Sequence, residues 1–471
     1  MINATAYRDK RVAVFGLARS GLATARSLAA GGAQVLAWDD NAAALKEAVA
    51  TTPGIHIENL YDIDFSGPAG VDALVVSPGV PLHAPVPHPL VRKAQRAGVG
   101  IIGDLQVFQS ARDQLPSHAV VAITGTNGKS TTTALLSHIL RETGVPAAEG
   151  GNIGTPVLGL EPLPTGGIYV FEMSSYQIDL CHDFAAEIAI LLNITPDHLD
   201  RHGDMEGYVA AKKRLFDMQG DDGIAIIGVD DAPSRMIAAT ANGRVVPISA
   251  EGPVDNGIFW QGGKLYDALD GAGKIAVDLS DISSLQGGHN GQNAAAAYAA
   301  ARLMGRSVEQ IASAMGTFTG LPHRMQLVDH LRGAAFINDS KATNTVAAAK
   351  ALEACHDIHW IAGGIFKEDT MEALAPGLSH VKQAYLIGDS AERFAAYLEG
   401  KCAAKISGTL QGAVRDAYDH VQPGETVLLS PACASFDQFK SFEHRGSVFV
   451  DVVRDLKGSD VKINEHKGAA L

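Results

Sequence analysis

The residues best suited to chemistry lie in one stretch, from 120 to 140, with the sequence VVAITGTNGKSTTTALLSHIL. Four apolar residues predict a buried strand that ends at Gly125, and apolar residues at helical spacing follow from Leu135. A glycine turn between a strand and a helix presents backbone N–H groups to a phosphate. Lys129 adds a positive charge there, and the hydroxyl of Ser130 can bind magnesium. The stretch therefore predicts a nucleoside triphosphate site.

The glycine spacing differs from that of the usual phosphate loop, which has four residues between its glycines. Here only Thr126 and Asn127 lie between Gly125 and Gly128. An ordinary strand-to-helix turn with a chance Lys–Ser pair is the alternative explanation. We favour the phosphate site because a strand, two glycines, a lysine and several hydroxyls coincide.

Further polar side chains follow two apolar segments of the same region. Glu172 ends an apolar run at 168–172, and Asp197 and His198 follow the run IAILLNIT. Open α/β sheets bind ligands at the carboxyl ends of their strands, and oxygen ligands suit a hard divalent cation. Alone, Glu172 could be a solvated strand end and His198 a helix-start residue. Beside a phosphate loop, the pair indicates a metal-dependent nucleotide site.

The totals for the chain restrict its class. Its 471 residues are enough for two to four domains, and 46% hydrophobic residues fit a globular protein with sizeable cores. A net charge of −14 without a long Lys/Arg run argues against a nucleic-acid partner. Four cysteines without C-x-x-C spacing argue against a zinc site and favour a reducing cytoplasm. We find no apolar run of about 18 residues and no signal peptide, so we expect a cytoplasmic protein away from the membrane.

Apolar segments alternate with helical patterns along the whole chain, which favours an α/β fold. Polar, Pro-containing segments at 112–118 and 317–326 look like linkers. We therefore expect three domains: a Rossmann-like N-terminal domain (1–112), a central P-loop ATPase-like domain with a mostly parallel sheet (113–320), and a Rossmann-like C-terminal domain (321–471).

The N-terminal segment 11–41 is similar to a dinucleotide-binding fingerprint. It contains a strand, the turn GLARSG and a helix, and Asp39 follows the next strand. The middle glycine of the fingerprint, which lets a pyrophosphate approach the backbone, is replaced by Ala18. NAD binding and a plain turn remain alternatives, but we favour a nucleotide diphosphate bound at the same strand ends.

Seven motifs together resemble the ATP-dependent Mur ligases of bacterial peptidoglycan synthesis. They are GTNGKST, GGNIG, FEMSSYQ, LNITPDHLDRH, TGLPHR, INDSKATN and LLSPACASFDQF, and the resemblance covers all three expected domains. Two long motifs, NDSKATN and SPACASFDQFKSFEHRG, resemble the family members that add D-glutamate. The resemblance implies that ATP converts a carboxylate into an acyl phosphate, which an amine attacks to give an amide, ADP and phosphate.

The resemblance also implies roles for individual residues. Catalysis would fall to Lys129, His198, Lys212 and Arg324. The ATP site would comprise Gly125, Thr126, Asn127, Gly128, Lys129, Ser130, Thr131, Asn293, Arg324, Asp339 and Lys341. Two magnesium ions would be bound by Ser130, Glu172, His198 and Lys212, the last as its carbamate. Without the resemblance, the helix that carries Lys212 and Lys213 would be interpreted as a solvated basic face.

The remaining implied contacts concern the other two substrates, UDP-N-acetylmuramoyl-L-alanine and D-glutamate. The uridine nucleotide would contact Arg19, Ser20, Asp39, Gly79 and Asn152. D-Glutamate would contact Thr343, Lys367, Ser435 and Phe442. We expect a monomer. Two alternatives from other classes are an NAD-dependent dehydrogenase and a nucleotide-gated switch or scaffold.

Overall fold

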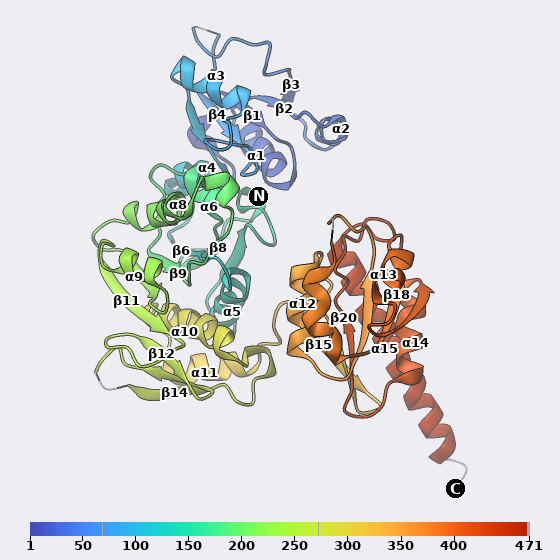
Figure 1. The fold of residues 1–471 in the computed structure, drawn as a ribbon. Helices are drawn as coiled ribbons and strands as arrows, with labels where there is room; N and C mark the ends of the chain where they lie inside the picture. Colours follow the sequence, from blue (N-terminus) through green and yellow to red (C-terminus); the bar gives the residue numbers. More distant parts are fainter. Residues whose placement is uncertain (68, 272, 369, 469–471) are drawn as a thin grey trace. The chain divides into compact units, whose positions relative to one another are not determined.

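The computed structural model describes residues 1–67, 69–271, 273–368 and 370–468, with only the backbone given for residue 283 and residues 459–468. The chain divides into two compact units, Met1–Phe318 and Thr319–Leu471 (Figure 1). Over the described residues, two β-sheets belong to the first unit and one to the second. The predicted α/β fold with mostly parallel sheets is confirmed.

The first sheet is parallel throughout and has the strand order β3-β2-β1-β4-β5. Its strands are β1 (Arg11–Phe15), β2 (Gln34–Trp38), β3 (Ile55–Ile57), β4 (Ala73–Val76) and β5 (Gly100–Ile102). Helices α1 (Arg19–Ala30) and α4 (Asp104–Ala111) pack on one face. Helix α3 (Pro89–Ala97) and the connection after β3, which contains no helix in its described residues 58–67 and 69–72, cover the other face. Helix α2 (Ala42–Thr51) connects β2 to β3.

The second sheet contains the expected phosphate-loop strand, β6 (His118–Thr124), between β9 and β8 in the order β14-β13-β12-β11-β10-β9-β6-β8-β7. The other strands are β7 (Ala147–Gly151), β8 (Gly167–Glu172), β9 (Ile188–Leu191), β10 (Ile224–Gly228), β11 (Arg244–Ser249), β12 (Ile258–Gln261), β13 (Lys264–Asp267) and β14 (Lys274–Asp278). The pairings of β13 with β12 and β14 are antiparallel, and the others are parallel. Strands β8 and β9 are buried along their whole length, as their unbroken apolar sequences require.

Helices cover both faces of this sheet. One face packs against α5 (Lys129–Glu142), α10 (Gly288–Leu303) and α11 (Val308–Gly316). The other packs against α6 (Ser175–Asp179), α8 (Met205–Asp217) and α9 (Ala232–Ala238), and α7 (Leu199–His202) precedes α8. Every residue from 294 to 301 of α10 is buried, and all but Tyr298 are alanines, so the helix lies close to its neighbours. One hydrophobic core continues from the first sheet to the second.

The third sheet organises the second unit, with the order β15-β16-β20-β17-β18-β19. Its strands are β15 (Gln326–Leu331), β16 (Ala334–Asn338), β17 (Ile358–Gly363), β18 (Val381–Ile387), β19 (Ala403–Gly408) and β20 (Thr426–Leu429). The β15–β16 pairing is antiparallel and the other pairings are parallel. The α-helices of this unit are α12 (Thr345–Ala354), α13 (Ala391–Leu398), α14 (Leu410–His420) and α15 (Phe442–Gly468). Short 3-10 helices are η1 (Thr5–Tyr7), η2 (Arg112–Gln114), η3 (Val157–Gly159), η4 (Ser283–Leu285) and η5 (Glu372–His380).

Candidate active site

The phosphate-loop segment connects β6 to α5, as the sequence predicts. Gly125 and Gly128 have φ angles of +149° and +87°, which residues with a side chain rarely adopt. A Cβ atom at Gly128 would lie 2.1 Å from Oδ1 of Asn293. The second glycine is therefore required both by its backbone conformation and by the close approach of α10.

Hydrogen bonds hold this loop against the segment that follows β9. The Thr126 N–H donates to the carbonyl of Asn193 (2.8 Å), and the Asn127 N–H donates to the Asn193 side-chain oxygen (2.9 Å). The Thr126 hydroxyl also donates to the carbonyl of Thr195 (3.1 Å) and lies 3.1 Å from the Tyr208 hydroxyl. Four contacts thus fix two loop residues, so the loop has a defined shape.

Two lysines converge on this loop. Nζ of Lys129 donates to the carbonyls of Gly125 (2.9 Å) and Thr126 (2.8 Å). Nζ of Lys212 donates to the same Gly125 carbonyl at 2.9 Å, and its side chain is 1% exposed. Burial, followed by the nearby charge of Lys129, lowers the pKa of Lys212 to about 7. At neutral pH a substantial fraction of Lys212 is therefore an uncharged amine.

Glu172 is buried at the end of β8 and connects two predicted site residues. Its Oε2 accepts a hydrogen bond from the Ser130 hydroxyl (2.7 Å), and its Oε1 accepts one from the Asn152 amide (2.8 Å). A carboxylate and a hydroxyl at the start of a phosphate-binding helix are the oxygen donors that Mg²⁺ prefers. The residues present therefore fit a magnesium ion at this position.

His198 occupies the turn before α7, with a φ angle of +52°. Its Nε2 lies 3.3 Å from Oδ2 of Asp197, and about half of its side chain is exposed. Over the part of the chain that the structure describes, no three His, Cys, Asp or Glu side chains gather as a metal-binding group. The predicted metal ligands His198 and Glu172 therefore do not form a cluster with a third residue of these types.

Asn293 and Thr131 were both predicted to contact ATP. The Asn293 side chain is buried, accepts a hydrogen bond from the Thr132 hydroxyl (3.3 Å) and donates one to Oδ1 of Asn290 (3.2 Å). Thr131 is half-buried in the first turn of α5. Asn293 thus supports the phosphate loop, and its contact with adenine stays a prediction.

Two polar side chains, Asp39 and Ser77, stabilise the turn after β1. Oδ2 of Asp39 accepts a hydrogen bond from the Leu17 N–H (2.6 Å), and the Ser77 hydroxyl donates to the Gly16 carbonyl (2.8 Å). A Cβ atom at Gly79 would meet no atom of the described chain within 4 Å. The ends of β1, β2 and β4 therefore form one polar edge of the sheet, with open space beside Gly79.

Arg19 begins α1, and its guanidinium donates to the Gly154 carbonyl at 2.6 Å. This contact joins the turn after β1 to the loop that carries Asn152. Ser20 is half-buried in the first turn of α1, and its carbonyl accepts a hydrogen bond from the Thr24 hydroxyl. The structure thus brings four of the five predicted uridine-nucleotide residues toward one edge: Arg19, Ser20, Asp39 and Gly79. Asn152 donates a hydrogen bond to Glu172, and its contact with the uridine nucleotide stays a prediction.

In the second unit, Asp339 follows β16 and is buried. Its Oδ2 accepts a hydrogen bond from the Ser430 hydroxyl (2.9 Å), and its Oδ1 accepts one from the Met325 N–H (3.1 Å). Burial raises the pKa of Asp339 to about 6, while these bonds and the charge of exposed Arg324 lower it by less. The carboxylate is therefore held in place at an electrostatic cost.

The other predicted residues of this unit lie around the ends of the same strands. Nζ of Lys341 lies 5.7 Å from the ring centre of Phe442. Lys367 lies on a loop after β17, with Nζ 5.6 Å from the ring centre of Phe436, which is 63% exposed. Thr343 is exposed, and Ser435 is buried after β20. Lysines with aromatic neighbours thus accompany Asp339 in this unit.

Comparison with known proteins shows which family this chain belongs to. The Mur ligase middle domain matches residues 123–301, and the Mur ligase glutamate ligase domain matches residues 323–433. The chain is 50% identical to the UDP-N-acetylmuramoylalanine–D-glutamate ligase of Sphingopyxis alaskensis, with 97% of this chain and all of that protein covered. The chain belongs to the Mur ligase family. The enzyme of the same name from Caulobacter vibrioides is 48% identical, with 97% of this chain and 98% of that protein covered.

Solved structures of other Mur ligases share the fold. The UDP-N-acetylmuramate–alanine ligase of Thermotoga maritima has a TM-score of 0.57 at 16% identity and covers 95% of this chain and 99% of its own. A UDP-N-acetylmuramoyl-L-alanyl-D-glutamate–2,6-diaminopimelate ligase has a TM-score of 0.55 at 17% identity, with 97% and 94% covered. In the described part of this Mur ligase, none of the helices has the length and hydropathy of a membrane span.

Two arginines of this Mur ligase were not singled out from the sequence. Arg201 of α7 donates to the carbonyls of Pro78 and Val80, in the turn after β4, and its guanidinium lies 5.1 Å from the Tyr176 ring centre. It thus fastens the turn beside Gly79 to the helix that His198 precedes. The only sequence signal is its place in the motif DHLDRH.

Arg445 is the second of these residues and is 1% exposed within α15. Its guanidinium donates to the Ser340 hydroxyl (3.0 Å), the Ser340 carbonyl (2.8 Å) and the Cys433 carbonyl (3.1 Å). None of these acceptors is a carboxylate, and burial lowers the pKa of Arg445 to about 10. Arg445 therefore joins the loop of Asp339 to the loop of Ser435 while remaining charged at neutral pH.

Proposed function

We propose that the protein joins D-glutamate to the L-alanine carboxylate of UDP-N-acetylmuramoyl-L-alanine, using ATP and releasing ADP and phosphate. The observation that carries this proposal is the 50% identity, over 97% of the chain, to a ligase named for these substrates. The reaction belongs to peptidoglycan precursor synthesis and to the enzyme class EC 6.3.2.9. We assign the uridine nucleotide to residues 1–112, ATP to residues 113–320 and D-glutamate to residues 321–471.

The chemistry requires a carboxylate to become a good acyl donor. Transfer of the γ-phosphoryl group of ATP to the carboxylate oxygen gives an acyl phosphate and ADP. The amine nitrogen of D-glutamate then attacks the acyl carbon, the C–O bond to phosphate breaks, and a proton leaves the nitrogen. Triphosphate and acyl phosphate bring several negative charges together, which the ammonium of Lys129 and the guanidinium of Arg324 would offset. His198, at the exposed turn before α7, is our candidate for accepting the amine proton.

Magnesium would be bound through the Ser130 hydroxyl and the Glu172 carboxylate, whose 2.7 Å contact presents two oxygen donors beside the loop. His198 is a further candidate ligand. When bound, the ion would polarise the phosphoryl group and neutralise developing charge. The Asn152 amide would keep the Glu172 carboxylate in position, since it occupies the other carboxylate oxygen at 2.8 Å.

Lys212 is our candidate for carbamylation. The supporting observation is a buried amine with a pKa of about 7, because only the uncharged amine reacts with CO₂. The amine nitrogen bonds to the carbon of CO₂ and loses a proton, which leaves a carbamate with one negative charge. This negative charge would attract the ammonium of Lys129. The carbamate would also add oxygen atoms to the magnesium site.

D-Glutamate carries two carboxylates and one amine. We propose that Lys367 and Thr343 bind its α-carboxylate, and that Ser435, with nearby backbone N–H groups and Phe442, binds the side-chain end. We further propose that Asn293 and Asp339 contribute to the nucleotide site, with Lys341 beside Asp339. The protein would act as a cytoplasmic monomer without nucleic acid, and light scattering after size exclusion measures its mass.

A coupled assay of ADP release tests the proposed function. ADP should appear only when ATP, Mg²⁺, D-glutamate and UDP-N-acetylmuramoyl-L-alanine are all present. ADP release without an amine and a carboxylate substrate would instead favour a nucleotide-gated switch. Formation of reduced nicotinamide would favour a dehydrogenase. Mass spectrometry of the product should show one amide between the two substrates.

The D-glutamate assignment has its own test in Lys367→Ala. Removing one charge partner of a desolvated carboxylate costs about 2–4 kcal/mol, so the KM for D-glutamate should rise roughly 30- to 700-fold. The KM values for ATP and the uridine nucleotide should stay within about threefold. Lys350→Ala, at an exposed position of α12, is the matched control and should leave all three values unchanged. Equal rises for all three substrates would contradict the assignment.

A further inference from the structure

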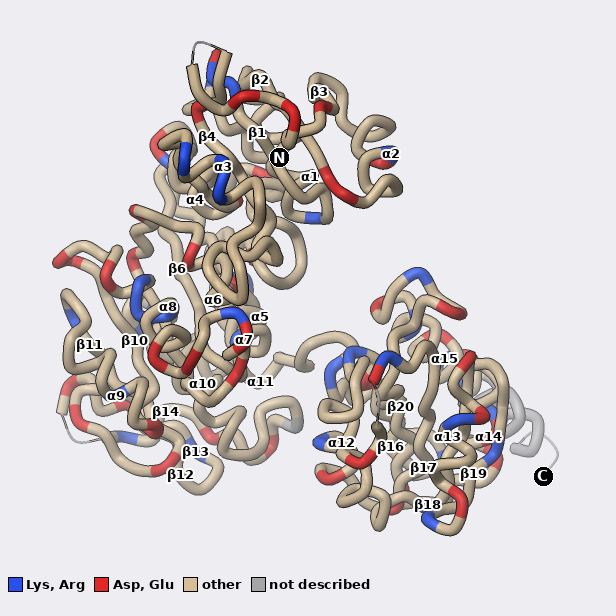
Figure 2. The backbone as a smooth tube through the Cα atoms, turned by 45° about the horizontal axis from the view of Figure 1, so that its top comes forward, with Lys and Arg blue, Asp and Glu red and all other residues tan. Residues whose placement is uncertain are grey.

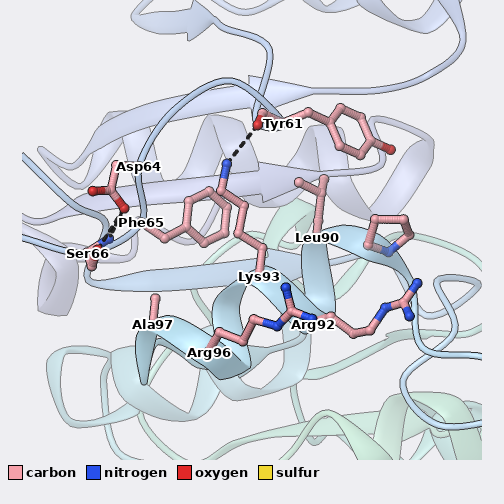
Figure 3. Close-up of a pocket in the computed structure, with 10 residues that line it drawn as sticks. Tyr61, Asp64, Phe65, Ser66, Leu90, Arg92, Lys93, Arg96 and Ala97 are labelled. Carbon is pink, nitrogen blue, oxygen red and sulfur yellow. Dashed lines mark hydrogen bonds between the residues drawn. The ribbon is translucent and has the colours of Figure 1, made fainter.

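A pocket of about 640 Å³ lies beside α3, and its lining residues include none of those assigned to the reaction (Figure 3). It lies between α3 and the connection after β3, which contains no helix in its described residues 58–67 and 69–72. Phe65 and Leu90 are buried in the core beneath it, so its floor is apolar. A doubly wound sheet usually has a helix at this place, whereas the described residues of the connection form none.

The wall of the pocket is fixed by Lys93. Its Nζ donates to the carbonyls of Leu60 (3.1 Å) and Tyr61 (2.8 Å) and lies 5.0 Å from the ring centre of Phe65. Figure 3 shows Lys93 reaching from α3 to the backbone at Tyr61. The ammonium therefore ties the connection to the helix and holds this wall of the pocket in place.

Two further cations, Arg92 and Arg96, line the pocket. Arg92 and Arg96 are exposed, one turn apart on α3, and extend in the same direction along the helix (Figure 3). Among the described residues, neither guanidinium has a carboxylate partner within 4.0 Å. Figure 2 shows the Lys and Arg positions of α3 as a cluster, in a chain whose net charge is −14.

The simplest alternative is that α3 presents an ordinary solvated face. Like charges four residues apart on a helix destabilise it by a few tenths of a kcal/mol. On a face that only contacts water, the wall held by Lys93 and the apolar floor at Phe65 and Leu90 would have no role. Arg92 and Arg96 together with a preformed pocket are better explained by a ligand whose negative charge removes their repulsion.

The opposite end of the pocket has a different character. Oδ1 of Asp64 accepts hydrogen bonds from the N–H (2.9 Å) and the hydroxyl (2.7 Å) of Ser66. Within the described chain, Oδ2 of Asp64 has no hydrogen-bond donor. Figure 3 shows Asp64 and Ser66 away from the Arg92 guanidinium. A ligand that fits both ends is therefore anionic at one end and carries hydroxyl donors at the other.

We propose that this pocket binds a small phosphomonoester that carries hydroxyl groups. Two guanidinium groups match the three oxygens and double charge of a phosphate better than a single carboxylate. The hydroxyls of the ligand donate to Oδ2 of Asp64, and its carbon atoms lie over Phe65 and Leu90. This site is separate from the proposed ligase reaction.

A ligand bound in the pocket can affect the uridine-nucleotide residues through Tyr61 and Asp40. The Tyr61 hydroxyl donates to Oδ2 of Asp40 (3.0 Å), and the Trp38 ring N–H donates to Oδ1 of the same carboxylate (3.2 Å). Asp40 adjoins Asp39, which accepts from the turn after β1. A ligand that displaces the Tyr61 backbone therefore changes the surroundings of Trp38, which gives a signal independent of catalysis.

Isothermal titration of the full chain with sn-glycerol 3-phosphate at low salt tests the proposal. Arg92→Gln together with Arg96→Gln should weaken this binding at least about tenfold, because two charge-assisted contacts are lost. The matched control is Arg8→Gln with Lys46→Gln, which removes two exposed charges elsewhere in residues 1–112 and should leave the Kd unchanged. Lys129→Ala, which disables the phosphate loop, should also leave it unchanged. Equal Kd values for the two double variants would overturn the site.

The assigned ligand chemistry has separate tests. D-Glycerate, with similar hydroxyls but one carboxylate, should bind at least about tenfold more weakly than sn-glycerol 3-phosphate. Asp64→Ala should weaken sn-glycerol 3-phosphate but not inorganic phosphate, since only the former offers carbon-bound hydroxyls to Oδ2. Glycerate binding as tight as the phosphomonoester, or an equal effect of Asp64→Ala on both phosphates, would refute the assignment.

Discussion

Replacing Asp339 by asparagine should stabilise the second unit at pH 8 and leave its stability near pH 4 almost unchanged. Burial raises the pKa of Asp339 from its ordinary value of 3.8 to about 6. A carboxyl with a raised folded-state pKa binds its proton more tightly in the folded than in the unfolded chain. Stability is therefore lost as the pH rises from 3.8 through about 6, and the loss is complete above that range.

The magnitude follows from the same two values. Each pKa unit corresponds to about 1.4 kcal/mol, so the ionised carboxylate costs the folded unit about 3 kcal/mol at pH 8. Asparagine can keep both hydrogen bonds, because its oxygen accepts from the Met325 N–H and its amide donates to the Ser430 hydroxyl. We expect a gain of about 2–3 kcal/mol at pH 8 and less than about 1 kcal/mol at pH 4.

Urea denaturation followed by tryptophan fluorescence measures this gain. Trp360 is buried in the core of the second unit, whereas Trp38 and Trp260 lie in the first unit. Changing the latter two to phenylalanine leaves a fluorophore that reports the second unit alone. Asp389→Asn, at an exposed position, is the control for loss of one negative charge. If Asp339→Asn destabilised the unit equally at both pH values, the electrostatic cost assigned to this carboxylate would be refuted.

Three other substitutions test the remaining contacts. Lys129→Ala should lower the rate of ADP release at least about 100-fold with little change in melting temperature, and near-normal turnover of the folded variant would contradict the phosphate-loop assignment. Lys212→Ala should be nearly inactive and partly rescued by short carboxylates such as acetate, while its neighbour variant Lys213→Ala keeps its activity; the reverse pattern would assign the role to Lys213. Arg445→Lys keeps the charge but loses the forked contacts of the guanidinium. Urea denaturation should therefore show that the free energy of unfolding of the second unit falls by about 3 kcal/mol. An unchanged midpoint would show that these contacts do not stabilise the unit.

The sequence predicted those features that depend on burial or on the ends of parallel strands. Strands β6, β8 and β9 are buried on both faces, so their unbroken apolar runs identify them. Ser130 and Glu172 follow neighbouring parallel strands, and they meet at 2.7 Å because such strands end at one edge. Strand β19 gives no such signal, because five of its six residues are exposed and no apolar pattern marks it.

Contacts between side chains and backbone carbonyls could not be predicted in the same way. Arg201 and Arg445 donate to carbonyls of distant loops, and every residue of a chain carries a carbonyl. The residue type therefore gives no information about its partner. Lys212 has the same problem, because a lysine on an amphipathic helix is ordinarily solvated, whereas here it reaches the Gly125 carbonyl. Only the resemblance to a family singled it out.

The alanine segment of α10 limits how this protein can evolve. A larger side chain anywhere from 294 to 301 would have to displace α5 or the sheet, since every position there is already buried. Such overpacking typically costs 1–3 kcal/mol. Helix α10 carries Asn293 against the phosphate loop, so the same displacement would move the loop. A substitution in the loops at the sheet edge can therefore change nucleotide affinity without repacking, whereas one in the alanine segment would also move the helix beneath the loop.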